Sequence, residues 1–194
     1  ANIVLRTEVL NRLNFDKKAK IIVATASSLS EKVLKKEDFK AISHKIKVGD
    51  QLDFDFTEEL LHQFNFNHTD FVSEPGEFSV RGGIVDVFSY SNEEPYRITF
   101  FGNEVESIKT FDIETQLSKE KIKEFQLVSN MNFSVLGTKV SLFDLSTKDL
   151  VVIKKNAFVG INTIKNFYAK AEEKFGTLST EIKHQKPAEL FVSE

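Results

Sequence analysis

Two arginines in an acidic stretch are the residues whose type and position most favour a binding chemistry. The chain contains 22 Lys but only four Arg, and Arg81 and Arg97 both lie in its middle third. Residues 46–118 carry 15 Asp and Glu against four Lys and Arg. Arginine presents a planar five-donor fork that lysine cannot reproduce, so it suits bidentate or stacked contacts. We therefore predict such contacts at Arg81 and Arg97.

Strand parity adds an aromatic ring to these arginines. Residues 96–101 alternate in a way that is typical of a strand with one buried face, so the even-numbered side chains should face a core. Arg97 and Phe101 then point outward, about 13 Å apart along the strand. Aromatic and arginine side chains are enriched at protein interfaces. The predicted partner-binding residues are Arg81, Arg97 and Phe101.

The alternative for these arginines is an ion pair within their own domain, for instance between Arg97 and Glu93, Glu94 or Glu104. Surface ion pairs contribute roughly 0–1 kcal/mol and seldom require arginine, so composition favours an interface. Burial of the three side chains, or their capture by carboxylates of the same domain, would argue against an interface.

No catalytic constellation is visible. The chain lacks GxxxxGK[ST], GxGxxG, GxSxG and HExxH motifs, and it has no cysteine for a thiolate nucleophile, a zinc thiolate site or a disulfide. Its four histidines are scattered, and the carboxylates of the middle third are interpreted as helix caps and a solvated face. We predict no catalytic residue, no cofactor and no metal site, and we do not expect an enzyme.

The candidate residues require a small antiparallel sheet. Two of the three prolines and four of the eight glycines lie between positions 74 and 112, where they separate four short strand-like runs. The runs are 77–81, 84–88, 96–101 and 105–111. Short alternating runs joined by tight glycine turns predict an antiparallel meander.

Charge divides the chain into three parts. Residues 1–45 have a net charge of +5, residues 46–118 of −11, and residues 119–194 of +3. The sharp change marks the middle as a separate unit, which should repel nucleic-acid phosphates. We predict an α+β fold in which residues 43–118 are inserted into a partial α/β domain formed by 1–42 and 119–194.

The flanking segments supply the remaining elements. The first predicted helix covers 4–13, with Leu5, Val9, Leu10 and Leu13 on one side. A second helix contains Leu29, Val33 and Leu34, and its cap is Thr25 or Ser27-Ser28, with Glu31 in a capping box three residues after Ser28. Two more run from an Asp55 cap to Phe64 and over 157–175, the latter ended by Gly176. Predicted strands cover 21–24, 46–49, 122–128 and 150–153, with 21–24 and 150–153 of the type buried in a parallel sheet. No apolar run reaches the ~18 residues of a membrane span, so we expect no membrane contact. We also expect the protein to be cytoplasmic and monomeric.

Three segments of the middle region resemble a known family. The segments are EPGEFSVRGGIVDVF, EPYRITFFGNEVESI and FDIETQ. They are similar to the N-terminal module of the bacterial transcription-repair coupling factors (Mfd). That module is itself similar to the first domains of the excision-repair helicase UvrB. The resemblance extends to almost the whole chain through three flanking segments, LNRL, IIVATASSL and SLFDLSTKDLVVIKKNAF. Gly83 after Gly82 favours the coupling factors over UvrB, and Ser89 departs from a common proline.

The resemblance implies a recruitment function. In these factors the small second domain binds the damage-recognition protein UvrA, and its contact residues correspond to Arg81, Arg97 and Phe101 here. It also implies a degenerate helicase fold without ATPase motifs, whereas the full-length family protein is an ATP-dependent DNA translocase that contacts RNA polymerase and DNA through parts absent here. An alternative function is nucleic-acid binding through the basic flanks, which must weaken steeply with salt.

Overall fold

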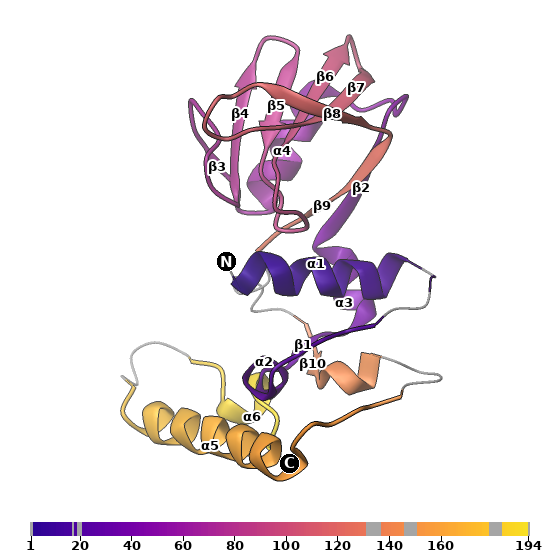
Figure 1. Cartoon of the computed structure of the whole chain (residues 1–194). Helices are drawn as coiled ribbons and strands as arrows, with labels where there is room; N and C mark the ends of the chain where they lie inside the picture. Colours follow the sequence, from indigo (N-terminus) through magenta and orange to yellow (C-terminus); the bar gives the residue numbers. More distant parts are fainter. Residues whose placement is uncertain are drawn as a thin grey trace. The chain divides into compact units, whose positions relative to one another are not determined.

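The structure is a computed structural model that describes residues 2–16, 18, 21–130, 137–145, 151–178 and 184–193. It divides into two compact units. One unit, here called the sheet unit, comprises Ala1–Lys17 and Phe39–Val135, and the other, the helical unit, comprises Lys18–Asp38 and Leu136–Glu194. Helices and small antiparallel sheets together confirm the α+β class (Figure 1).

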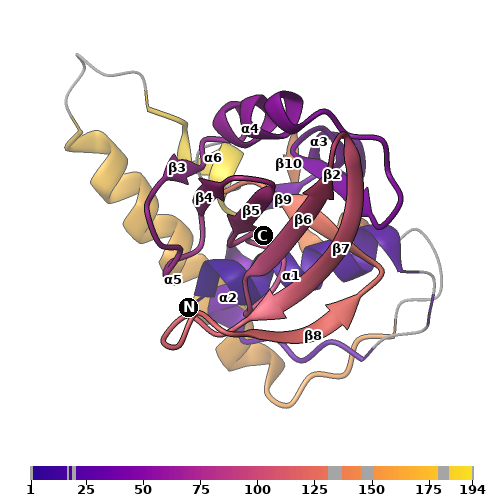
Figure 2. The same ribbon diagram turned by 90° about the horizontal axis from the view of Figure 1, so that it is seen from above.

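The sheet unit is built on six strands in the order β3-β4-β5-β6-β7-β8. They are β3 (Asn67–His68), β4 (Glu77–Arg81), β5 (Ile84–Val87), β6 (Tyr96–Phe101), β7 (Glu104–Phe111) and β8 (Ser118–Ile122). All neighbours are antiparallel except β3 and β4, which run parallel. The predicted meander is therefore confirmed as β4–β7, and Figure 2 shows β6 and β7 as a long curved hairpin.

Glycine permits the two tight turns of the meander. Gly82 (φ +59°) joins β4 to β5, and Gly102 (φ +58°) joins β6 to β7. Positive φ at the first turn residue is what a type II′ hairpin requires, and it is strained for a residue with a Cβ. At the adjacent Gly83, glycine is favoured by lack of space and not by its φ angle, since a Cβ there would lie 3.1 Å from the carbonyl oxygen of Phe100.

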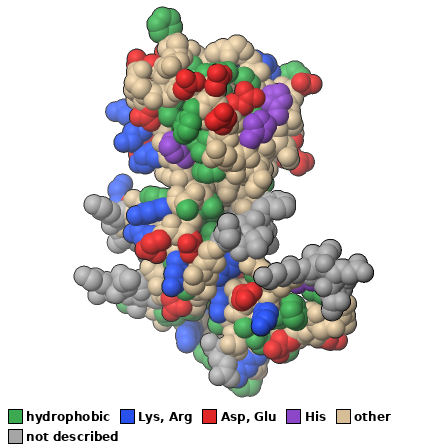
Figure 3. Space-filling view, turned by 180° about the vertical axis from the view of Figure 1, so that it is seen from behind, with side chains coloured by type: hydrophobic (Ala, Val, Ile, Leu, Met, Phe, Trp, Pro, Cys, Tyr) green, Lys and Arg blue, Asp and Glu red, His purple; other side chains and the backbone are tan. Residues whose placement is uncertain are grey.

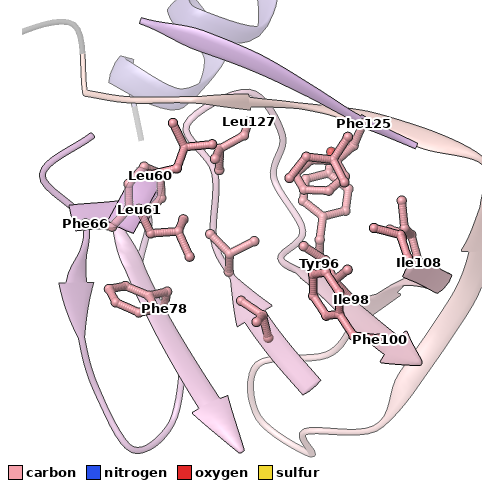
Figure 4. Packing of buried hydrophobic residues seen from close by; sticks show 14 residues of the cluster. Leu60, Leu61, Phe66, Phe78, Tyr96, Ile98, Phe100, Ile108, Phe125 and Leu127 are labelled. Atoms are coloured by element: carbon pink, nitrogen blue, oxygen red, sulfur yellow. The ribbon is translucent and has the colours of Figure 1, made fainter. Parts of the chain in front are cut away.

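One face of the sheet carries the core. The cluster includes Leu60, Leu61, Phe66, Phe78, Val85, Val87, Ile98, Phe100, Ile108 and Leu127 (Figure 4). Tyr96 stacks on Phe125 with ring centroids 4.1 Å apart, and burial raises the pKa of Tyr96 to about 12. The predicted inward direction of the even-numbered residues of β6 is thus confirmed.

Helix α4 (Phe54–Gln63) contributes Leu60 and Leu61 to this core. Its cap is Asp53, whose carboxylate accepts from the backbone N–H of Asp55 at 2.9 Å. The prediction of Asp55 as the cap was therefore wrong by two residues. Figure 3 shows acidic and histidine side chains gathered on the sheet unit as seen from behind.

Two further elements of the sheet unit differ from the predicted ones. The predicted strand over 122–128 is divided, because β8 ends at Ile122 and β9 (Glu124–Val128) pairs instead with β2 (Ser43–Lys47). Helix α1 (Asn2–Phe15) buries Val4 and Leu10 but exposes Leu5 and Val9. The predicted apolar side of α1 was right for Leu10 but wrong for Leu5 and Val9, because the buried face runs through the polar residues Thr7 and Asn14.

The helical unit contains mainly short elements. They are α2 (Ala26–Ser30), β1 (Val33–Leu34), β10 (Lys139–Val140), the 3-10 helix η1 (Leu142–Leu145), α5 (Ala157–Gly176) and α6 (Pro187–Leu190), with α3 (Lys36–Ala41) at the boundary between the units. Strands β1 and β10 pair antiparallel. Thr25, one of the two predicted caps, caps α2, but the capping box closes with Ser28, while Glu31 follows the helix end. The prediction that this helix contains Val33 and Leu34 was wrong, because both residues lie in β1 and pair with β10.

The two strands predicted for a parallel sheet are wrong where the structure describes them. Residues 21–24 are in no strand, and Ile21 and Val23 are almost fully exposed. Residues 151–153 are likewise exposed and unpaired, while Leu150 lies outside the described residues. Helix α5 is confirmed, although it continues through Gly176 and none of its residues is buried. No helix among the described residues is long and apolar enough to cross a membrane.

Candidate docking surface

The face of the sheet opposite the core presents two rows of side chains across the strands. Register places Ser79, Asp86, Arg97 and Lys109 in one row. A second row, two residues along each strand, contains Arg81, Ile84, Thr99 and Ser107. Phe101 follows Thr99 by two residues, so parity places it on the same face at the end of β6. The three predicted residues therefore share the outward face.

Asp86 lies at the centre of this face and binds both arginines. Its side chain is 1% exposed. Arg97 donates Nε to Oδ1 at 2.7 Å and Nη2 to Oδ2 at 2.8 Å, while Arg81 donates Nη2 to Oδ2 at 2.6 Å. One buried carboxylate thus neutralises one of two guanidinium charges, and the group keeps a net charge of +1.

Arg97 is largely occupied by its own domain. Besides the two bonds to Asp86, its Nη1 donates to the carbonyl of Gln116 at 3.0 Å and to Oγ of Ser118 at 3.3 Å. Its guanidinium carbon lies 4.7 Å from the ring centroid of the buried Phe111. The hydrogen bonds to Asp86 raise the pKa of Arg97, and its side chain is only 18% exposed.

Arg81 keeps donors for another molecule. Its side chain is 42% exposed, and within the described part of the chain only Nη2 donates to a protein atom. The Arg81 guanidinium carbon also lies 5.3 Å from the ring centroid of Phe71, a cation–π contact. Asp86 and Phe71 together hold this guanidinium in place and leave Nε and Nη1 available.

Phe101 is the most exposed apolar ring on this face, at 79%. It precedes the tight turn at Gly102, and its backbone pairs with Glu104 of β7. A large apolar side chain on a well-paired strand loses little conformational freedom when a partner covers it. Phe101 has the geometry of an anchor.

The predicted alternative, an intradomain ion pair, is confirmed in kind, although the partner is Asp86 and not Glu93, Glu94 or Glu104. The condition given above as arguing against an interface is therefore met for Arg97 and in part for Arg81, whereas Phe101 stays exposed. Sequence reasoning had placed Asp86 among the solvated carboxylates. Its position two residues after Ile84 in an alternating strand was the available signal, because that parity puts it on the face that carries Arg97.

A tight turn supports Arg97 from the side. Oδ1 of Asp112 accepts from the backbone N–H groups of Glu114 and Thr115, and Oδ2 lies 3.2 Å from Nζ of Lys119. The hydrogen bond from Thr115, then that from Lys119, lowers the pKa of Asp112 to about 2. Gln116, with φ +58°, ends the turn and offers its carbonyl to Arg97.

The described residues contain no cluster of three His, Cys, Asp or Glu side chains that could hold a metal ion. An open depression of about 240 Å³ lies in the sheet unit between α1 and the β2–β9 pair, and the residues that line it include Asn11, Arg12, Lys45 and Glu124. It does not include any of the three predicted residues.

Comparison with known proteins agrees with this description. Residues 44–133 match the family described as the UvrB interaction domain, an interaction domain and not a catalytic one. These residues contain the whole six-stranded sheet together with α4, all but the first residue of β2, and most of the core.

Several bacterial transcription-repair-coupling factors are similar over a larger part of the chain. The Bacillus subtilis protein is 34% identical over 122 residues, covering 63% of this chain and 10% of that protein. The Escherichia coli protein is 26% identical over 174 residues, covering 90% of this chain and 14% of that protein. The Myxococcus xanthus protein is 35% identical over 107 residues. The chain thus spans about a tenth to a seventh of the length of these relatives.

Proposed function

We propose that this chain, whose residues 44–133 match the UvrB interaction domain family, is a recruitment module of a transcription-repair-coupling factor and that it binds UvrA. Arg81, Arg97 and Phe101 form the docking surface. In this proposal the module brings excision repair to RNA polymerase stalled at a lesion, and the DNA and polymerase contacts belong to other parts of the full-length protein.

The observation that carries the proposal is the state of Arg81. Its guanidinium is held by Asp86 yet keeps unpaired donors, and it shares a face with the exposed ring of Phe101. A pre-positioned guanidinium beside an exposed aromatic ring is the composition of an interface hot spot. The partner surface that fits it offers a carboxylate or carbonyl oxygen next to an apolar patch.

Arg97 has a different role within the same surface. Since its three nitrogens already donate to Asp86, Gln116 and Ser118, it contributes mainly by fixing Asp86, which in turn positions Arg81. Removing Arg97 weakens binding indirectly, so Arg81 and Phe101 provide the cleaner test.

The test is calorimetric titration of the chain with purified UvrA. We expect Arg81→Ala to weaken binding by about 2 kcal/mol, roughly 30-fold, with a similar loss for Phe101→Ala. Arg12→Ala is the matched control, because Arg12 is an exposed arginine that pairs with Glu8 on α1, and it should bind as the wild type does. Equal affinity of wild type, Arg81→Ala and Phe101→Ala would overturn the proposal.

A further inference from the structure

A second exposed aromatic ring lies beside Arg81, on a segment that precedes the meander. Phe71 is 62% exposed, and its neighbour Val72 is fully buried. The ring centroid of Phe71 lies 5.3 Å from the guanidinium carbon of Arg81.

The backbone around Phe71 is fixed at several points. The N–H of Thr69 donates to the carbonyl of Phe78 at 2.8 Å, and Oγ of Ser79 donates to the carbonyl of Asp70 at 3.0 Å. Beyond Phe71, Nε2 of Gln116 donates to the carbonyl of Val72 at 3.1 Å.

The next bond ties the segment to the start of β4. The N–H of Ser73 donates to the carboxylate of Glu77 at 2.8 Å. The segment is therefore held against the sheet on both sides of Phe71 while the ring itself stays largely exposed. A ring on a fixed backbone loses little entropy when a partner covers it.

We infer that Phe71 is a further contact residue of the docking surface, which extends across Arg81 to a second aromatic anchor. The inference rests on the proposed function. Arg81 then lies between two exposed rings, with Phe71 beyond β4 on one side and Phe101 at the end of β6 on the other. From the register and a strand spacing of about 4.8 Å, the Cα atoms of Arg81 and Phe101 are roughly 12 Å apart.

This arrangement specifies the chemistry of the partner. The partner presents an acidic side chain to Nε and Nη1 of Arg81, flanked on both sides by apolar surface that covers Phe71 and Phe101. Covering the rings removes water from around the Arg81 contact, which strengthens a charged hydrogen bond there. A partner with only an acidic patch would leave both rings exposed.

The inference is tested by titrating UvrA with Phe71 variants in the same assay as Arg81→Ala and Phe101→Ala. Phe71→Ala is expected to weaken binding about tenfold or more. Phe71→Leu keeps apolar area but loses the cation–π contact, so it should weaken binding by a smaller factor. The matched control is Phe56→Ala, since Phe56 is an exposed phenylalanine on α4, which packs on the core side of the sheet. Its affinity should equal that of the wild type.

The outcomes separate the two claims. If Phe71→Ala binds as the wild type does while Arg81→Ala and Phe101→Ala lose affinity, the inference about Phe71 is overturned and the proposed function stands. If none of the three variants loses affinity, the proposed function is overturned as well.

A second measurement on the wild-type chain avoids any folding defect of the variants. Hydrogen exchange with and without UvrA should slow for the amides of residues 69–73 when UvrA is bound, together with those around Phe101. Unchanged exchange in 69–73 combined with slowed exchange around Phe101 would overturn the inference.

Discussion

The two units treat their apolar residues differently. The sheet unit places Phe78, Ile98 and Ile108 in a continuous core and leaves only a few aromatic rings outside it. The helical unit leaves most of its large apolar residues exposed, including Phe158 and Ile161 on α5. Both units have segments with a strong apolar pattern in the sequence. Among the described residues, α4 packs on the sheet and covers the apolar face of the sheet unit, whereas the apolar residues of α5 are not buried.

This contrast makes the exposed rings of the sheet unit informative about function. Phe71 and Phe101 are both exposed rings on the outer face of the sheet unit, and they lie beside a guanidinium held by Asp86. Among the described residues, α5 contacts α2 and α6 but none of its own side chains is buried, and its exposed residues carry no such marker of function.

The largest expected effect tests the core against the exposed helix. Phe78→Ala should lower the free energy of unfolding of the sheet unit by about 3–5 kcal/mol, because it leaves a cavity at a fully buried position. Phe158→Ala on α5 should change stability by no more than about 0.5 kcal/mol. Urea unfolding followed by circular dichroism measures both. A large effect of Phe158→Ala would show that another surface covers α5 in solution.

The next effect separates the two arginines. Arg97→Ala should destabilise the sheet unit by about 2–3 kcal/mol, because it removes two bonds from the buried carboxylate of Asp86. Arg81→Ala removes one bond from a more exposed side chain and should cost about 1 kcal/mol or less. Thermal unfolding of the two variants measures which of them is destabilised more. Lys165→Ala on α5 is the neutral control. The reverse order would contradict the supporting role assigned to Arg97.

A smaller effect is expected for the cap of α2 in the helical unit. Thr25→Ala removes the side-chain oxygen that accepts from the N–H of Ser28, and should weaken α2 by about 1 kcal/mol. Hydrogen exchange of residues 26–30 should become faster, while exchange in β4–β7 should not change. Faster exchange in both regions would mean that the two units are coupled more strongly than their separate cores suggest.

The smallest effect concerns acid sensitivity of the turn beside Arg97. The pKa of Asp112 is lowered in the folded state to about 2, below its ordinary value of 3.8, so its contribution to stability is present above pH 4 and is lost as the pH falls toward 2. NMR titration of the Asp112 carboxyl should therefore show a midpoint near 2. In Asp112→Asn, thermal stability should fall less between pH 5 and pH 2.5 than in the wild type. A midpoint near 4 would show that the turn does not bind this carboxylate.

The sequence predicted best where local pattern and tertiary environment agree. The runs of β4–β7 alternate strictly, and their turns contain glycines at positions that need positive φ, so strands and turns could be predicted. The failures at 21–24 and 150–153 have one cause. A short apolar run predicts a buried strand only if neighbouring strands exist to pair with it, and pairing is not a local property.

Within the candidate site, the sequence could predict the face of the sheet to which a side chain points, but not the residues that it binds. Parity showed that Arg97 and Phe101 face outward, and the scarcity of arginine drew attention to Arg81. Neither reveals that Asp86 binds both guanidinium groups, because the hydrogen bonds join residues of three strands and depend on their register.

The amino-acid sequence by itself determined the meander, the acidic character of its unit, the outward positions of three candidate residues and the resemblance to coupling factors. The tertiary structure alone decided which outward side chains are already occupied and which remain available. The physical reason is that alternation along a strand is set by local backbone geometry, whereas the pairing of a guanidinium depends on where other strands and loops place their oxygen atoms.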